Sequence, residues 1–215
     1  MSSGCLRFFS FQEDSSSRHA AGLRNDKKSD MEINAGFTAI LVVLVIRFFL
    51  PLTILKWPVG GFLLAILGDI ADVMILQKWP PDIDPLYYHR FDNFFDTYYL
   101  FFAYLASRKW ADPLARKTAA YLYWWRFAGF VIYEATGFQA IFALAPNIFE
   151  NFYLFGAVIH KWFVSYRLTW LRLGVWLLIL GLPKVFQEYI MHYRYPGSAW
   201  AFFRDNVFWW IYPAP

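Results

Sequence analysis

The chain has 215 residues, of which 59% are hydrophobic, 23% are aromatic and only 17% are charged, with a formal net charge of +4. This composition is typical of a membrane protein of one helical domain. It argues against a soluble enzyme and against a nucleic-acid partner, because no basic stripe accompanies the small positive charge. A single cysteine, Cys5, excludes an intramolecular disulfide.

Polar and apolar segments divide the chain into three parts. Residues 1–32 are polar and serine-rich and contain no apolar core of signal-peptide length, so we expect a flexible tail. Residues 33–195 are expected to form the membrane domain. The aromatic segment 196–215 is expected to lie along the membrane interface.

Six apolar stretches in the membrane domain can each supply the roughly 20 residues that a bilayer requires. They cover residues 33–55, 59–77, 86–107, 114–136, 138–162 and 170–193. The sequence therefore predicts an all-α, six-transmembrane-helix bundle, with Gly137 allowing a tight reversal between the fourth and fifth helices. Lysines and arginines are nearly balanced between the two sides, so charge does not orient the chain.

Four aspartates lie near the ends of the second and third stretches. Asp69 and Asp72 are three residues apart, and Asp92 and Asp96 are four apart, so each pair shares one face of a helix. Asp72 and Asp92 lie at the same depth from the connecting loop, and Asp69 and Asp96 lie one turn deeper. If the two helices pack antiparallel, the four carboxylates form two layers of one site.

Carboxylates this close cannot all ionise without a positive partner. Divalent cations such as Mg²⁺, Mn²⁺ or Ca²⁺ prefer oxygen ligands and suit such a site. Alternatively, Arg47, Arg90, Arg126 or another buried base neutralises the aspartates as a structural network. The matched depths favour a metal site.

These residues resemble the signature of the CDP-alcohol phosphotransferase family. That signature reads D-x-x-D-G-x-x-A-R, then about eight residues, then G-x-x-x-D-x-x-x-D, across the second and third of six transmembrane helices. This chain has DIADVMILQ at residues 69–77 and YHRFDNFFD at residues 88–96. Arg47 and Pro51 also resemble the family's opening R…P pattern. The motif resemblance covers about residues 33–110.

All four acidic positions match, and the other positions of the signature depart from it. Val73 replaces the first glycine, Leu76 the alanine, Gln77 the arginine and Tyr88 the second glycine, and the intervening segment is two residues longer. In the family the small residues leave room for the cytidine nucleotide. The metal half of the motif is therefore kept and the nucleotide half is not.

The resemblance implies a transferase that moves a phosphatidyl or phospho-alcohol group from a nucleotide-diphosphate-linked lipid to an alcohol. Asp69, Asp72, Asp92 and Asp96 would hold two Mg²⁺ or Mn²⁺ ions, and Asp96 would also take the proton of the attacking hydroxyl. Arg47, Arg90 and Arg126 are weaker candidates for binding substrate phosphate. The expected setting is phospholipid biosynthesis in a bacterial inner membrane or its equivalent, with membrane lipids as partners.

Further polar residues interrupt the later stretches. Asn147, Glu150 and Asn151 share one helix face, where they could bind a headgroup hydroxyl, although a helix–helix hydrogen-bond set is the somewhat favoured interpretation. Lys184 and Glu188 are spaced to form an ordinary pair within one helix.

Two other functions remain open. The chain could be a catalytically silent relative that acts as a structural or accessory subunit, as a homodimer or within a membrane complex, and an arginine or lysine against the carboxylates would favour it. A channel or transporter is weaker, because no repeat or broken helix is visible.

Overall fold

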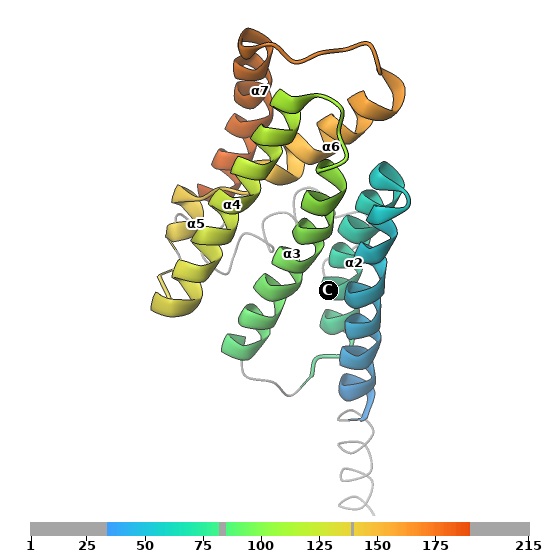
Figure 1. Cartoon of the computed structure of the whole chain (residues 1–215). Helices are drawn as coiled ribbons and strands as arrows, with labels where there is room; N and C mark the ends of the chain where they lie inside the picture. The colour runs from blue at the N-terminus through green and yellow to red at the C-terminus, as the bar shows by residue number, and fades with distance from the viewer. Residues whose placement is uncertain (1–33, 82–84, 139, 190–215) are drawn as a thin grey trace, which may run out of the picture.

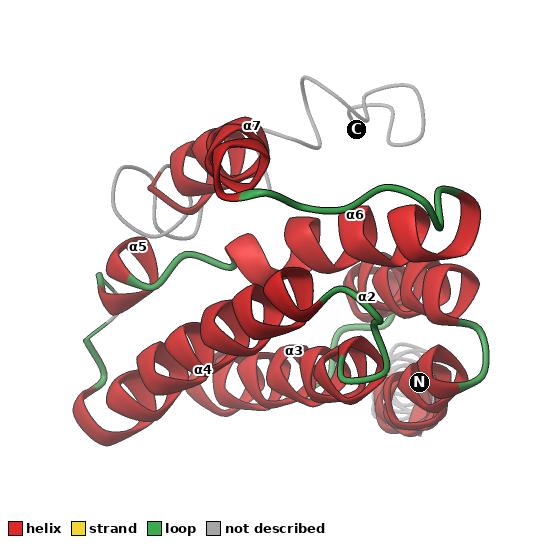
Figure 2. Cartoon of the chain, turned by 45° about the horizontal axis from the view of Figure 1, so that its top comes forward, coloured by secondary structure: helices red, strands yellow, loops and turns green. Residues whose placement is uncertain are grey.

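The computed structural model describes residues 34–81, 85–138 and 140–189, which form helices and no strand. The tails expected at residues 1–32 and 196–215 lie outside the described residues. The helices run side by side, with α3 between α4 and α2, and with α7 lying beyond α6 (Figure 1, Figure 2).

The first helix, Asn34–Leu55, narrows into a 3₁₀ segment, η1 (Leu50–Leu55), where Pro51 lacks the amide hydrogen that an α-helix needs. After one short turn the chain enters α2 (Pro58–Lys78). The two elements approach closely at Gly61, where a Cβ atom would lie 2.5 Å from the backbone nitrogen of Ile54. Glycine therefore allows the first helix to pack against α2.

The next helices are α3 (Pro85–Ser107) and α4 (Pro113–Thr136). Asp112 caps the N-terminus of α4 by accepting hydrogen bonds from the backbone nitrogens of Leu114 and Ala115. Gly137 ends α4 in the left-handed conformation with φ of 69°, which confirms the expected reversal.

The prediction of one continuous helix over residues 138–162 is wrong. This stretch consists of α5 (Ile141–Leu144) and α6 (Ile148–Trp162), with residues 145–147 unwound between them. Pro146 accounts for the break, because proline has no amide hydrogen and disfavours helix in the residue before it. A transporter was disfavoured in part because the sequence showed no broken helix, and this break removes that argument. The last described helix is α7 (Trp170–Tyr189).

Four segments are long and apolar enough to cross a membrane, which indicates a membrane protein. They are Asn34–Leu55, Pro58–Lys78, Ile141–Trp162 and Trp170–Gln187. The helices α3 and α4 have 23 and 24 residues but are not among them. The described chain thus supports an all-helical membrane fold with four apolar spans rather than the full six.

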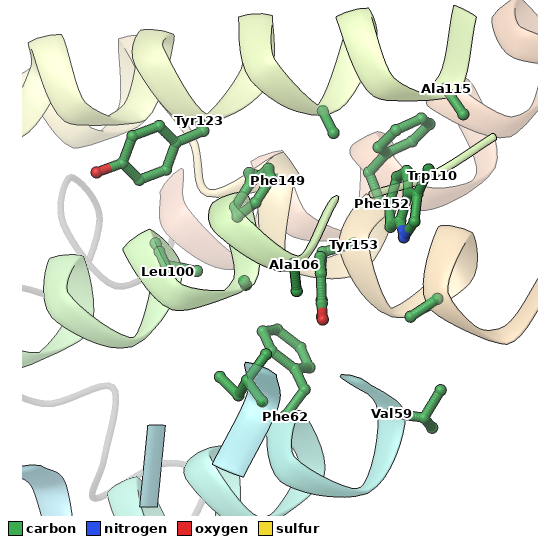
Figure 3. Packing of buried hydrophobic residues seen from close by; sticks show 14 of the residues in the cluster. Val59, Phe62, Leu100, Ala106, Trp110, Ala115, Tyr123, Phe149, Phe152 and Tyr153 are labelled. Atoms are coloured by element: carbon green, nitrogen blue, oxygen red, sulfur yellow. The ribbon is translucent and has the colours of Figure 1, made fainter. Parts of the chain in front are cut away.

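An aromatic core joins α2, α3, α4 and α6 (Figure 3). The ring of Phe62 on α2 lies 4.6 Å from that of Tyr153 on α6, and Phe149 on α6 lies 5.6 Å from Tyr123 on α4. Leu100 on α3 is buried in the same cluster. Core residues precede the aspartates on α2 and follow them on α3, so the core and the aspartates occupy opposite halves of these antiparallel helices.

Candidate functional site

The four aspartates converge, and Arg47 of the first helix lies among them. Its Nη1 atom lies 2.7 Å from Asp72 Oδ2 and 2.5 Å from Asp92 Oδ1. Its Nη2 atom contacts Asp69 and lies 2.7 Å from Asp96 Oδ1. The helical spacing predicts this grouping, with Asp72 beside Asp92 and Asp69 beside Asp96.

The cluster is closed on one side and open on the other. The side chains of Arg47 and Asp72 are only 4% and 1% exposed, whereas those of Asp69, Asp92 and Asp96 are 32–40% exposed. An ion that reached the cluster would therefore meet the three partly exposed aspartates first.

The geometry of these three partly exposed aspartates fits a cation. Asp69, Asp92 and Asp96 each offer a carboxylate oxygen, and these oxygens lie within 4.8 Å of one another. Magnesium, manganese and calcium ions all bind such hard oxygen ligands. The set therefore could hold a divalent cation, provided that Arg47 leaves room for it.

Arg47 forms hydrogen bonds with only three of the four aspartates. It donates hydrogen bonds to Asp69, Asp92 and Asp96. Neither oxygen of Asp72 has a hydrogen-bond partner among the described residues, although one lies close to Nη1. The planar guanidinium has fixed donor directions, and these directions do not reach all four carboxylates.

Arg90 and Arg126 do not enter the cluster. The Nε atom of Arg90 lies 3.8 Å from Glu134 Oε2, and the Arg90 side chain is half exposed. Arg126 donates from Nη1 to the carbonyl of Ala145 at 3.0 Å and lies over the ring of Phe142. It is nevertheless close enough to Asp96 for an electrostatic interaction.

The polar residues at the start of α6 bond to one another and to α7. Asn147 donates to Glu150 Oε2 at 2.9 Å, and Asn151 donates to the carbonyl of Leu180 at 3.1 Å. Lys184 Nζ lies 2.9 Å from Glu150 Oε2, so it pairs across helices. The Glu188 side chain, its expected partner, lies outside the described side chains. These contacts form the helix–helix set, and a headgroup role stays a prediction.

Sequence reasoning missed Tyr99, a buried residue of α3. It lies close enough to Asp96, Asp69 and Glu150 to interact with them electrostatically. Its position three residues after Asp96 places it on the same helix face, and that spacing could have identified it.

Asp112, just beyond the C-terminus of α3, links the loop before α4 to the loop before α7. Its Oδ1 caps α4, and its Oδ2 accepts from the backbone nitrogen of Leu168 at 2.8 Å. Burial alone would raise the pKa of this carboxyl group, but the backbone hydrogen bonds outweigh burial and hold the pKa below its usual value. The ionised form is therefore the stabilised one.

In comparisons with known proteins, no family model, curated protein or solved structure matches the chain.

Proposed function

We propose that this membrane protein is a divalent-metal-dependent transferase, which moves a phosphatidyl or phospho-alcohol group from a nucleotide-diphosphate-linked donor to an alcohol. The observation that carries the proposal is the meeting of four carboxylates from α2 and α3 around a single guanidinium. The resemblance of their spacing to CDP-alcohol phosphotransferases supplies the reaction class.

Charge supports a cation at this site. Four ionised carboxylates and one guanidinium leave three uncompensated negative charges, which a low-dielectric interior disfavours. Protons or cations must make up the difference. Because Asp69, Asp92 and Asp96 present oxygens within 4.8 Å of one another, divalent cations fit there, and Asp72 would complete the set.

The chemistry then follows from these side chains. Mg²⁺ or Mn²⁺, held by Asp69, Asp72, Asp92 and Asp96, would supply positive charge to a diphosphate. Asp96 would accept the proton of the attacking hydroxyl. The alcohol oxygen bonds to phosphorus as the bond from that phosphorus to the bridging oxygen breaks, and a nucleoside monophosphate leaves with the electron pair.

We also propose that α3 and α4 cross the membrane, which gives six spans. Both exceed about 20 residues, the length that a bilayer needs. Their polar side chains account for the lower hydropathy: Asp92 and Asp96 face Arg47, and Arg126 bonds to Ala145. A role in lipid synthesis would place the protein in a bacterial inner membrane or its equivalent.

A second candidate is a catalytically silent relative that serves as a structural or accessory subunit. The position of Arg47 among the carboxylates is the arrangement expected for it. Val73, Leu76, Gln77 and Tyr88, which replace the small and basic residues of the signature, point the same way. One ion-paired network would then replace the metal site.

Metal binding by the full-length protein in detergent separates the two candidates. The transferase proposal expects calorimetry to detect Mn²⁺ binding, and expects Asp72→Asn and Asp96→Asn to abolish it while the protein stays folded. Asp112→Asn, the same change outside the cluster, serves as the matched control and should retain binding. Labelled nucleotide-linked lipid donors then test for product. No Mn²⁺ binding by the wild type would favour the silent relative.

A further inference from the structure

Each terminal nitrogen of Arg47 lies between one carboxylate of α2 and one of α3. Nη1 lies 2.7 Å from Asp72 and 2.5 Å from Asp92, and Nη2 contacts Asp69 and lies 2.7 Å from Asp96. The guanidinium therefore spans both layers of the cluster, with one nitrogen in each layer.

These nitrogens stand where shared cations would bridge the two helices. A divalent ion that used the same oxygens would lie within a few ångströms of the guanidinium and repel it. The oxygens that now accept from Arg47 would also be engaged by the ion. Arginine and metal are therefore competitors for one set of ligands.

We propose that Arg47 is a displaceable internal cation, which holds the four aspartates together before divalent ions bind and withdraws when they do. This inference rests on the proposed function, since it concerns the same cluster. It makes Arg47 a residue that sets how tightly the site holds its metal.

The guanidinium of Arg47 has an aromatic neighbour as well as the four carboxylates. The ring of Phe95 lies 5.7 Å from the Cζ atom of Arg47, within the range of a cation–π contact. A guanidinium that kept this ring contact would remain beside the cluster, where its charge could meet an anionic phosphate.

The hydrogen bonding of Asp72 also favours exchange. This side chain is 1% exposed, yet its oxygens lack a hydrogen-bond partner among the described residues. A divalent ion bound between the two helices could take an oxygen of this fourth carboxylate as a ligand as well. Replacing Arg47 with metal would thus give this carboxylate a ligand bond in place of an ion pair that lacks a hydrogen bond.

Calorimetric titration of the full-length protein with Mn²⁺ tests the competition. Arg47→Met should bind Mn²⁺ about tenfold or more tightly than the wild type, because no charge-assisted hydrogen bonds must be broken first. Arg47→Lys, with one nitrogen in place of two, should fall between them. Arg172→Met is the matched control and should bind Mn²⁺ as the wild type does, because Arg172 donates to the carbonyl of Arg167 and lies over the ring of Tyr166, away from the cluster.

Unchanged or weaker binding by folded Arg47→Met and Arg47→Lys, with clear binding by the wild type, would overturn the inference and leave the proposed function standing. Absence of binding in the wild type and in both variants would overturn both. If Arg47→Met does not fold, a structure of the wild type with Mn²⁺ decides. Anomalous scattering should place manganese between the carboxylates with Arg47 withdrawn, and an unmoved Arg47 beside bound manganese would contradict the competition.

Discussion

The Nη1 atom of Arg47 and the Oδ2 atom of Asp72 lie 2.7 Å apart without forming a hydrogen bond of good geometry. Both side chains are almost fully buried, so the pair is held together by charge rather than by a well-aligned donor. The other three aspartates also need the same guanidinium. In the absence of metal, Asp72 is therefore the least satisfied member of an overcharged cluster.

Neutralising Asp72 should stabilise the metal-free protein. In EDTA, we expect Asp72→Asn to raise the free energy of unfolding by roughly 1–2 kcal/mol, because the one buried charge among four mutually repelling carboxylates disappears. Thermal unfolding in detergent measures the change. Added Mn²⁺ should stabilise the wild type and leave the variant unaffected. A lower melting temperature for Asp72→Asn in EDTA would show instead that the buried ion pair itself stabilises the fold.

Helix positions and the convergence of the aspartates could be predicted because they depend on local spacing. Residues three or four apart share a helix face, and an antiparallel pair of helices brings equal depths together. The position of Arg47 could not be predicted in this way, because Arg47, Arg90 and Arg126 were all candidates to neutralise the aspartates. Only the packing of the first helix against α2 and α3 selects Arg47. The pairing of Lys184 with Glu150 was missed for the same reason, since it depends on how α6 meets α7.

The broken fifth helix shows a different limit of sequence reasoning. Pro146 marks the break in the sequence, but a single proline in an apolar stretch can also kink a continuous helix. The structure decides through Arg126, which donates to the freed carbonyl of Ala145. Gly129 allows α4 to approach the unwound segment closely, since a Cβ atom there would lie 2.5 Å from the Cβ of Ala145. Tertiary contacts therefore stabilise the unwound segment.

Removing the Asp112 carboxylate should destabilise the fold. Asp112→Ala loses the acceptor for three backbone amides, those of Leu114, Ala115 and Leu168. We expect a loss of about 2–4 kcal/mol in unfolding free energy, from the helix cap and from the bond to the connection before α7. Asp112→Asn keeps one side-chain oxygen and should lose less. Equal stability of Asp112→Ala and the wild type would mean that water replaces these bonds without loss.

The carboxylate of Asp112 should make the free energy of unfolding depend on pH in the acidic range. Because the pKa of Asp112 is lower in the folded protein than in the unfolded chain, its contribution is complete above the unfolded value and is lost as the pH falls through the folded value. Stability should therefore decrease below about pH 4. Denaturant titrations across this range measure the slope, and Asp112→Asn should flatten it. An identical slope in that variant would assign the acid sensitivity to other carboxylates.

The contact between Gly156 and Trp110 should tolerate no added methyl group. A Cβ atom on Gly156 would lie 2.2 Å from the indole of Trp110, whose ring stacks on Tyr153 and His160. Gly156→Ala should therefore lower the unfolding free energy by about 1–3 kcal/mol. Gly174→Ala is the matched control, since nothing lies within 4 Å of that site in α7, and it should be neutral or slightly stabilising. Similar melting temperatures for the two variants would contradict the packing.

Breaking the pair between Glu150 and Lys184 should loosen α7 from α6. Lys184 Nζ lies 2.9 Å from Glu150 Oε2, and both side chains are largely buried, so Lys184→Met would leave a carboxylate without its charge partner. We expect a loss of about 2–4 kcal/mol. The double variant Glu150→Gln with Lys184→Met removes both charges and should recover much of the loss. Unfolding of the wild type, the two single variants and the double variant in detergent gives the coupling energy, and additive effects would show that this charge pair does not help to hold the two helices together.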